Sequence, residues 1–379
     1  MTSDLRKVCD PLLPTAQEIM GYLDVPDRNR WYANRGELVQ RLETRLSKAL
    51  GADRDVVTTA ASGTAALEAS IMATAGRATA EKPLALLPSY TFAATALAAE
   101  RCGYTPYFVD VDPQSWALDP AALADHPALA QAGVVLVVAP YGRLPDLTAF
   151  EAFRDQSGVP VVVDAAAAFE AVLSTPFARS SSLPICLSFH ATKTFSTGEG
   201  GAVVWDTQPG RELISQATNF GFLNSRECRM SGFNGKMSEY HAAVGHAMLD
   251  MYGRRAAAYA EVSRGYRVAF DARDVPGRLF VSPEVSSAYA LLEAEDRASA
   301  EHLHAVLSGA SFGWRRWYEH GLHNMAHFAA CPRDPLPVTE DLGLRLFGLP
   351  MAPDLAPSLI ADVATCVAPV SPPISRSAG

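Results

Sequence analysis

The chain has 379 residues, of which 49% are hydrophobic and 19% charged, and its net charge is −9. This composition predicts a folded protein with a large apolar core, two or three domains long, and excludes a disordered chain. The acidic balance argues against a broad nucleic-acid-binding surface, although it leaves room for a small cationic pocket.

The N-terminal residues do not resemble an export signal, and no stretch of 18 uninterrupted apolar residues could cross a membrane. Six cysteines stand at positions 9, 102, 186, 228, 331 and 366, and no two of them form a CxxC pair. In a chain of this length, such cysteines are typical of free thiols in a reducing compartment. We therefore expect a cytoplasmic protein with no nucleic-acid or membrane partner.

Strand and helix patterns alternate along most of the chain. A helix is predicted over 36–50, where apolar residues recur at helical spacing, and it ends at Gly51. Predicted strands follow at 55–60, 83–88, 104–112, 134–139 and 159–164, with helices between them at 61–76, 89–103 and 146–158. The runs 134–139 (VVLVVA) and 159–164 (VPVVVD) are typical of strands buried on both faces of a parallel sheet. The pattern predicts an α/β fold with a mostly parallel central sheet between helices.

The pattern changes near residue 236. A long helix is predicted over 236–272 with a break near Gly253, followed by a strand-like segment at 285–295, a helix at 298–309 and a proline-rich remainder. We expect a large domain over residues 1–250, with an N-terminal arm, and a smaller C-terminal α+β domain over 251–370. The tail, 371–379, is expected to be mobile.

One lysine is distinguished by its surroundings. Lys193 lies in the stretch SFHATKTFSTGEGG (188–201), between two short apolar runs that are predicted strands. Most lysines lie on the surface, but burial would lower the pKa of this amine and make it a nucleophile for carbonyl compounds. Ser188 and Thr192 add hydroxyl groups that suit a phosphate. Lys193 is therefore a candidate catalytic residue.

Other groups that a pyridoxal phosphate site requires occur elsewhere in the chain. Asp164 ends a predicted strand, where open α/β sheets bind ligands, and it either pairs with the ring nitrogen or caps the following helix. The stretch ASGTAAL (61–67) is either a phosphate site at a helix N-terminus or an ordinary helix cap. Phe92 either stacks on the ring or belongs to the core. Each signal alone is weak, and their order along the chain is what makes them specific.

That order resembles the DegT/DnrJ family of fold-type I, pyridoxal phosphate-dependent sugar aminotransferases. The resemblance extends over nearly the whole chain, and it is carried by RWYANRGELVQRLETRL, SGTAALEA, LPSYTFAATALAAERCGYTPYFVDVDPQSWALDP, VVVDAAAAFEA, SFHATKTFSTGEGGAVV, NFGF and GFNGKMSEYHAAVG. It implies pyridoxal phosphate as the cofactor and a homodimer whose active sites lie at the subunit interface.

The resemblance also implies individual roles. Lys193 bonds the cofactor as a Schiff base and moves the proton in transamination, Asp164 pairs with the ring nitrogen, and Phe92 stacks on the ring. Asn234 reaches the cofactor phosphate in the neighbouring subunit. The cofactor-binding residues implied in this way are Gly63, Thr64, Phe92, Asp164, Ala167, Ser188, Lys193 and Asn234.

The sequence departs from the family pattern at two positions. Ala167 stands where many members have a polar residue that touches the cofactor, so either another hydroxyl or a water takes that place or the electronic properties of the ring differ. Lys236 stands where many members have arginine. Some relatives have histidine at the position of Lys193 and act as dehydratases, and the lysine retained here argues against that reaction.

A second set of residues is assigned to the substrate. In GWRRWYEHGLH (313–323), arginines beside aromatic rings suit a base and a diphosphate, or alternatively a contact between domains. The resemblance favours the first, because relatives with a similar stretch act on nucleotide-linked keto sugars. Two residues of RWYANRG belong either to the same pocket or to the start of the helix at 36–50. The predicted substrate-binding residues are Tyr32, Asn34, Arg316, Trp317, Tyr318 and His323.

Two other kinds of site are not predicted. GEGG (198–201) does not match the GxGxxG fingerprint of a dinucleotide site. His320, His323 and His327 have a spacing that could gather a metal, but surface or substrate-facing histidines in a loop are the favoured interpretation, so no metal is expected.

Together the sequence predicts an aminotransferase that moves the amino group of L-glutamate to a nucleotide-linked keto sugar and releases 2-oxoglutarate. The expected acceptor is a dTDP-linked 4-keto-6-deoxyhexose. The alternatives are the same chemistry on a 3-keto sugar, a cyclitol ketone or a small keto acid, and a non-catalytic, pyridoxal phosphate-binding regulatory protein.

Overall fold

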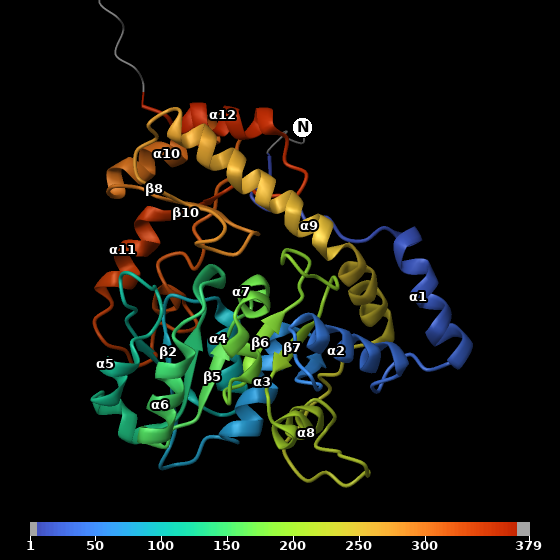
Figure 1. Ribbon diagram of the computed structural model, residues 1–379. Coiled ribbons are helices and arrows are strands. Elements are labelled where there is room, and N and C mark those ends of the chain that lie inside the picture. Colours follow the sequence, from blue (N-terminus) through green and yellow to red (C-terminus); the bar gives the residue numbers. More distant parts are fainter. Residues whose placement is uncertain (1–5, 370–379) are drawn as a thin grey trace, which may run out of the picture.

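The computed structural model describes residues 6–369, and its largest element is a seven-stranded sheet (Figure 1). The strand order is β1-β7-β6-β5-β4-β2-β3, and β7 alone runs antiparallel to its two neighbours. The strands are β1 (Val57–Ala60), β2 (Leu84–Pro88), β3 (Thr105–Val109), β4 (Ala132–Val138), β5 (Val161–Asp164), β6 (Ile185–Ser188) and β7 (Gly201–Val204). The predicted α/β fold with a mostly parallel sheet is confirmed.

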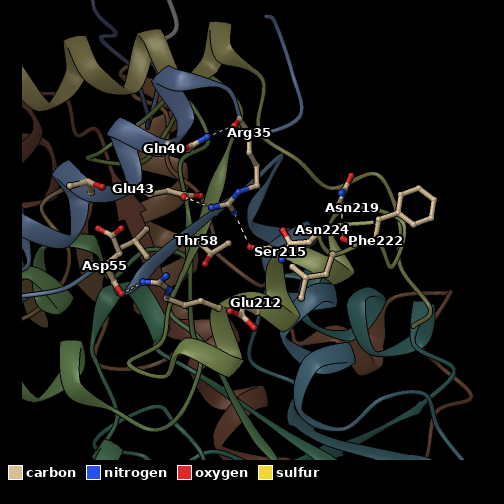
Figure 2. A pocket seen from close by; sticks show the side chains of 14 residues that line it. Arg35, Gln40, Glu43, Asp55, Thr58, Glu212, Ser215, Asn219, Phe222 and Asn224 are labelled. Carbon is tan, nitrogen blue, oxygen red and sulfur yellow. Dashed lines mark hydrogen bonds and ion pairs between the residues drawn. The ribbon is translucent and has the colours of Figure 1, made fainter. Parts of the chain in front are cut away.

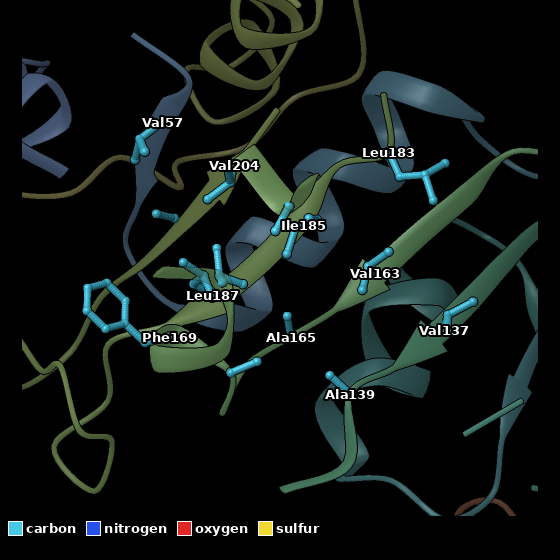
Figure 3. Packing of buried hydrophobic residues seen from close by; sticks show 14 of the residues in the cluster. Val57, Val137, Ala139, Val163, Ala165, Phe169, Leu183, Ile185, Leu187 and Val204 are labelled. Atoms are coloured by element: carbon cyan, nitrogen blue, oxygen red, sulfur yellow. The ribbon is translucent and has the colours of Figure 1, made fainter. Parts of the chain in front are cut away.

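The sheet is buried on both faces because alternate residues of its central strands enter two different apolar clusters. In β4, Val135 and Val137 join the cluster shown in Figure 3, while Val134 and Leu136 join the cluster on the opposite face. Helices cover the first face with α2 (Glu37–Ala49), α6 (Leu147–Ser157), α7 (Phe169–Ser174) and the start of α9 (Glu239–Asp271). They cover the second face with α3 (Gly63–Thr74), α4 (Ala93–Arg101) and α8 (Gln208–Ala217).

A smaller, three-stranded antiparallel sheet follows, in the order β10-β9-β8. Together with the second half of α9 it encloses a separate apolar cluster. The strands and helices of this C-terminal part of the chain are β8 (Arg278–Phe280), β9 (Ala290–Glu293), α10 (Arg297–Gly309), α11 (Pro337–Arg345), β10 (Leu346–Leu349) and α12 (Pro357–Val367). The remaining elements are α1 (Ala16–Asn29), α5 (Pro120–Ala124) and the short 3-10 helices η1 (Pro127–Gln131), η2 (Pro140–Gly142), η3 (Pro176–Ser180) and η4 (Leu322–Asn324).

Two sequence-based expectations for this part of the chain are wrong. The predicted break near Gly253 is absent, since α9 continues from Glu239 to Asp271. A glycine inside a helix costs only about 1 kcal/mol, and the packing of α9 along α1, α2 and α12 outweighs it. The segment 285–295 forms a strand only at Ala290–Glu293, because its first five residues form a turn.

The expected domain boundary near residue 250 falls inside α9 and stays a prediction. The tail expected to be mobile, 371–379, lies outside the described residues. Within residues 6–369 no helix combines the length and the hydrophobicity needed to cross a membrane.

Candidate active site

A cavity of about 340 Å³ lies at the carboxyl ends of the central strands. Asp164 and Ser188 end β5 and β6 there, and the N-terminal ends of α3 and α4 face the same space. Residues of the segment 315–318 and Tyr289 close it from the side of the smaller sheet. The end of the strands is where open α/β sheets place their ligand-binding groups. The cavity brings together Gly63, Thr64, Phe92, Asp164, Ala167, Ser188, Lys193, Trp317 and Tyr318 of the predicted residues.

Lys193 lies in the loop between β6 and β7, as the sequence predicted. Backbone hydrogen bonds hold this loop, including one from the N–H of Lys193 to the carbonyl of His190 at 2.9 Å. The amine reaches the cavity, where it donates to the hydroxyl of Tyr289 at 3.4 Å. Burial lowers the pKa of Lys193, and the negative charge of Asp164 opposes part of that shift. The site therefore contains an amine that loses its proton more readily than an ordinary lysine.

Asp164 is buried beneath the cavity, with 5% of its surface exposed. Its carboxylate accepts hydrogen bonds from the hydroxyl of Thr95 at 2.7 Å and from the N–H of Ala166 at 3.1 Å. Burial raises the pKa of Asp164, and these two hydrogen bonds and the charge of Lys193 act in the opposite direction. A carboxylate in this position is suited to hold a positive charge that enters the cavity.

The start of α3 forms a cradle for an anion. Ser62 caps the helix by accepting a hydrogen bond from the N–H of Ala65 at 3.1 Å. A Cβ atom at position 63 would lie 2.8 Å from the Cβ atom of Ser188, so only glycine lets the helix approach β6 this closely. Backbone N–H groups and the helix dipole favour a negative group here, next to the hydroxyls of Thr64 and Ser188.

Aromatic side chains form the remaining wall. Phe92 stands at the N-terminus of α4 and is 70% exposed although it lines the cavity, so its ring is free to stack on a flat ligand. Ala167 lies nearby and adds no polar side-chain atom.

The sequence comparisons agree with this geometry. The model of the DegT/DnrJ/EryC1/StrS aminotransferase family matches residues 15–368. The chain belongs to this family. The transaminase class expected from the sequence is therefore confirmed.

Individual bacterial proteins are also similar to the chain. Protein Rv3402c of Mycobacterium tuberculosis is 32% identical over 351 residues, which cover 89% of this chain and 83% of that protein. The dTDP-4-amino-4,6-dideoxy-D-glucose transaminase of Shigella dysenteriae is 32% identical over 244 residues, 64% of each chain.

Solved structures of similar proteins share the fold. A putative PLP-dependent aminotransferase from Bacillus cereus has a TM-score of 0.88 at 28% identity, covering 96% of this chain and 100% of that one. DesI, solved in the presence of its TDP-sugar product, has a TM-score of 0.83 at 29% identity, covering 97% and 92%.

Two predicted substrate residues of this family member lie outside the cavity. Arg316 points toward His304, with 3.4 Å between Nη2 and Nδ1, and Arg315 lines the cavity instead. Arg315 pairs with Gly348 in an extended segment, where neighbouring side chains point to opposite sides. His323 is buried, with its ring nitrogens 2.8 Å from the hydroxyl of Ser89 and 2.8 Å from the amide of Asn324.

Three further predicted residues, Tyr32, Asn34 and Asn234, are exposed and lie outside the cavity. Tyr32 stacks on Tyr240 with the ring centres 5.9 Å apart, and its carbonyl accepts the N–H of Glu239 at 3.1 Å. Asn234 accepts a hydrogen bond from Lys236 at 2.8 Å. Asn34 lies in the same loop as Tyr32, with a left-handed backbone, φ 61°. None of the three lines the cavity that contains Lys193.

Several residues of the site were not assigned from the sequence. Thr95 lies behind the cavity wall and donates to Asp164. It could have been found from the spacing of the two hydroxyls in TFAAT, because it follows Thr91 by one helical turn. Arg315 could have been preferred to Arg316 because it alternates with Trp317. His190 could have been found from its place three residues before Lys193. Tyr289 gave no signal, since only the folded chain brings it to the cavity.

A second cavity, of about 470 Å³, lies between α2, β1 and α8 (Figure 2). Arg35 forms an ion pair with Glu43 at 2.6 Å and donates to Ser215 at 2.9 Å, and Arg211 donates to the carbonyl of Asp55. Its arginines bind groups in its own wall, and no residue predicted for the active site lines it.

Proposed function

We propose that this chain is a pyridoxal phosphate-dependent aminotransferase that transfers the amino group of L-glutamate to a dTDP-linked 4-keto-6-deoxyhexose. The product is a 4-amino-4,6-dideoxy sugar nucleotide. The observation that carries the proposal is that Lys193 and Asp164 share one cavity with the anion-binding end of α3. The names of the Shigella transaminase and of DesI with its TDP-sugar product support the choice of acceptor.

The residues of the cavity fit pyridoxal phosphate. Lys193 supplies the amine, Asp164 a buried carboxylate for the ring nitrogen, and Phe92 an exposed ring for stacking. Gly63 leaves open the cradle at the start of α3 that suits the phosphate. When bound, this cofactor supplies an electron sink and carries the amino group from the first substrate to the second.

The chain's own groups divide the remaining work. The amine of Lys193 removes the proton from Cα of glutamate in the first half-reaction and delivers one to C4 of the sugar in the second. Asp164 would hold the positive charge of the ring nitrogen when the cofactor is bound. Trp317 and Tyr318 offer flat apolar surfaces to the sugar nucleotide, and Arg315 offers a cation to its diphosphate.

The test is amino transfer by the purified protein. With pyridoxal phosphate, L-glutamate and a dTDP-4-keto-6-deoxy sugar, we expect 2-oxoglutarate and an amino sugar nucleotide, both identified by mass spectrometry. A visible absorbance band should form with the cofactor and fade when glutamate is added. Faster turnover of a 3-keto sugar or a cyclitol ketone would overturn the proposed acceptor. Absence of the band and of 2-oxoglutarate would overturn the function.

Arg315→Gln is expected to lower kcat/KM for the sugar nucleotide about tenfold or more, because a hydrogen bond to a charged group contributes roughly 1.5–3 kcal/mol. Arg315 packs over the ring of Trp317, 5.0 Å from its centre. Steady-state kinetics with each substrate varied in turn measure the effect. Arg316→Gln is the decisive comparison, because the sequence-based assignment requires the larger loss in that variant.

We also propose a homodimer with shared active sites. Tyr32, Asn34 and Asn234 are exposed and none of them lines the cavity of its own chain, which supports a role at the site of a second copy. Light scattering measures the mass, and a fully active monomer would contradict this arrangement.

All six cysteines are free, which supports the expected location in a reducing cytoplasm.

A further inference from the structure

Tyr289 is the side chain that meets the amine of Lys193. The two polar atoms are 3.4 Å apart, and the amine also lies 5.9 Å from the centre of the ring. The ring of Tyr289 is held edge-on between two other aromatic rings, those of Tyr141 at 5.4 Å and Trp317 at 5.4 Å. With 8% of its surface exposed, Tyr289 has little freedom to leave this position.

The turn that carries Tyr289 is anchored to η2 and α7, which follow strands β4 and β5 of the large sheet. The N–H of Ser286 donates to the carbonyl of Tyr141 at 2.7 Å, and the hydroxyl of Ser286 donates to Glu170 at 3.2 Å. The N–H of Tyr289 closes the turn on the carbonyl of Ser286 at 2.9 Å. These bonds fix the hydroxyl of Tyr289 next to Lys193 through contacts that involve no ligand.

The turn also packs closely against the residue that departs from the family pattern. A Cβ atom at Gly142 would lie 2.6 Å from the carbonyl oxygen of Ala167 and 2.7 Å from the Cβ atom of Ser286. Ala167 therefore lies beside the turn, and its own side chain has no polar atom to offer the cavity. Tyr289 supplies a hydroxyl on this side.

The protonation states suit a hydrogen bond in either direction. Burial raises the pKa of Tyr289, so its hydroxyl keeps its proton at neutral pH. Burial lowers the pKa of Lys193, so its amine is readily neutral. The hydroxyl can donate to the neutral amine and accept from the ammonium form.

We propose that Tyr289 is a positioning residue for Lys193. The hydroxyl of Tyr289 holds the amine of Lys193 toward the cavity during both proton transfers. This rests on the proposed function. A misplaced amine slows proton transfer while the substrates still bind, so the hydroxyl acts on kcat and much less on KM.

The test compares two phenylalanine variants of the holoenzyme. Tyr289→Phe should lower kcat about 10- to 100-fold, as expected for a hydrogen bond to a group that becomes charged, with KM for either substrate nearly unchanged. It should also move the pH midpoint of the visible absorbance change of the bound cofactor by about one unit. Tyr90→Phe is the matched control, since its hydroxyl lies 2.8 Å from that of Tyr141 in the same aromatic cluster and does not line the cavity. This control should change neither quantity.

The outcomes separate the two proposals. If the visible band forms and amino transfer proceeds, but Tyr289→Phe keeps the kcat and the pH midpoint of the wild type, the role of Tyr289 is refuted and the function stands. Equal losses in both variants would show a purely structural effect and refute it too. If the wild-type protein forms no band with pyridoxal phosphate, both proposals are overturned.

Discussion

Lys193→Ala is expected to lower the rate of amino transfer about 10⁴-fold or more, because both the proton carrier and the covalent attachment of the cofactor are lost. The amine is the cavity group with a lowered pKa, and the loop between β6 and β7 holds it beside Tyr289. The measurement is single-turnover formation of 2-oxoglutarate, together with borohydride reduction and peptide mass spectrometry to locate the cofactor on the chain.

Lys48→Ala is the control. Because Lys48 is exposed on α2, this variant should retain full activity.

The pH dependence of cofactor attachment gives a second check on the role of Lys193. Only the neutral amine attacks the cofactor, and burial shifts the pKa of Lys193 below its ordinary value. Attachment to the cofactor-free protein should therefore become fast at a lower pH than an ordinary lysine allows. Near-normal turnover in Lys193→Ala would contradict the assigned role.

The sequence was most informative where a local pattern is typical of one kind of structure. A run such as VVLVVA is typical of a strand that is buried on both sides, and β4 and β5 lie in the middle of the sheet. Asp164 ends such a strand, so its position at the edge of the cavity followed from the fold class. Lys193 followed in the same way, from its place between two short strands.

Side-chain direction was less predictable, because it depends on local backbone geometry. Arg315 and Arg316 are adjacent residues of the same type, so the sequence does not distinguish them. The pairing of Arg315 with Gly348 decides which of the two side chains enters the cavity. His323 was assigned to the substrate from its sequence context, but in the structure its ring contacts the hydroxyl of Ser89, which directly follows β2.

Contacts between distant segments gave no sequence signal. Tyr289 approaches Lys193 because a turn at 286–289 hydrogen-bonds to Tyr141, and no local pattern records this. The continuity of α9 through Gly253 likewise depends on packing against other helices, which outweighs the weak helix propensity of glycine. The placement of Tyr32, Asn34 and Asn234 away from the cavity is of the same kind.

Asp164→Asn is expected to reduce activity without reducing stability. Removing one partner of a buried charge pair costs about 3–5 kcal/mol, which corresponds to a loss of about 10²- to 10⁴-fold in kcat. The hydrogen bonds need not be lost, because the amide oxygen can accept the N–H of Ala166 and the amide nitrogen can donate to Thr95. The hydroxyl of Thr95 can in turn donate to Thr91, 2.8 Å away.

The effect on stability has a definite sign. Burial raises the pKa of Asp164 above its ordinary value of 3.8, so the folded protein binds this proton more tightly than the unfolded chain does. The contribution of Asp164 to the free energy of unfolding of the cofactor-free wild type therefore falls as the pH rises from about 4 through the raised pKa. The asparagine variant has no such loss, so its advantage over the wild type should grow across that window and persist at neutral pH.

Asp112→Asn is the matched control of opposite sign. The backbone N–H of Ser115 donates to Asp112 at 2.7 Å and lowers the pKa of that carboxylate, which lies outside the cavity. This carboxylate stabilises the fold above its ordinary pKa, and the contribution is lost as the pH falls through its lowered pKa. Asp112→Asn should therefore lose stability at neutral pH and keep its activity. Urea unfolding between pH 4 and pH 8, with amino transfer measured in parallel, distinguishes the two variants. Asp164→Asn that remained fully active, or that lost stability as Asp112→Asn does, would show that Asp164 is an ordinary structural carboxylate rather than the charge partner of the cofactor.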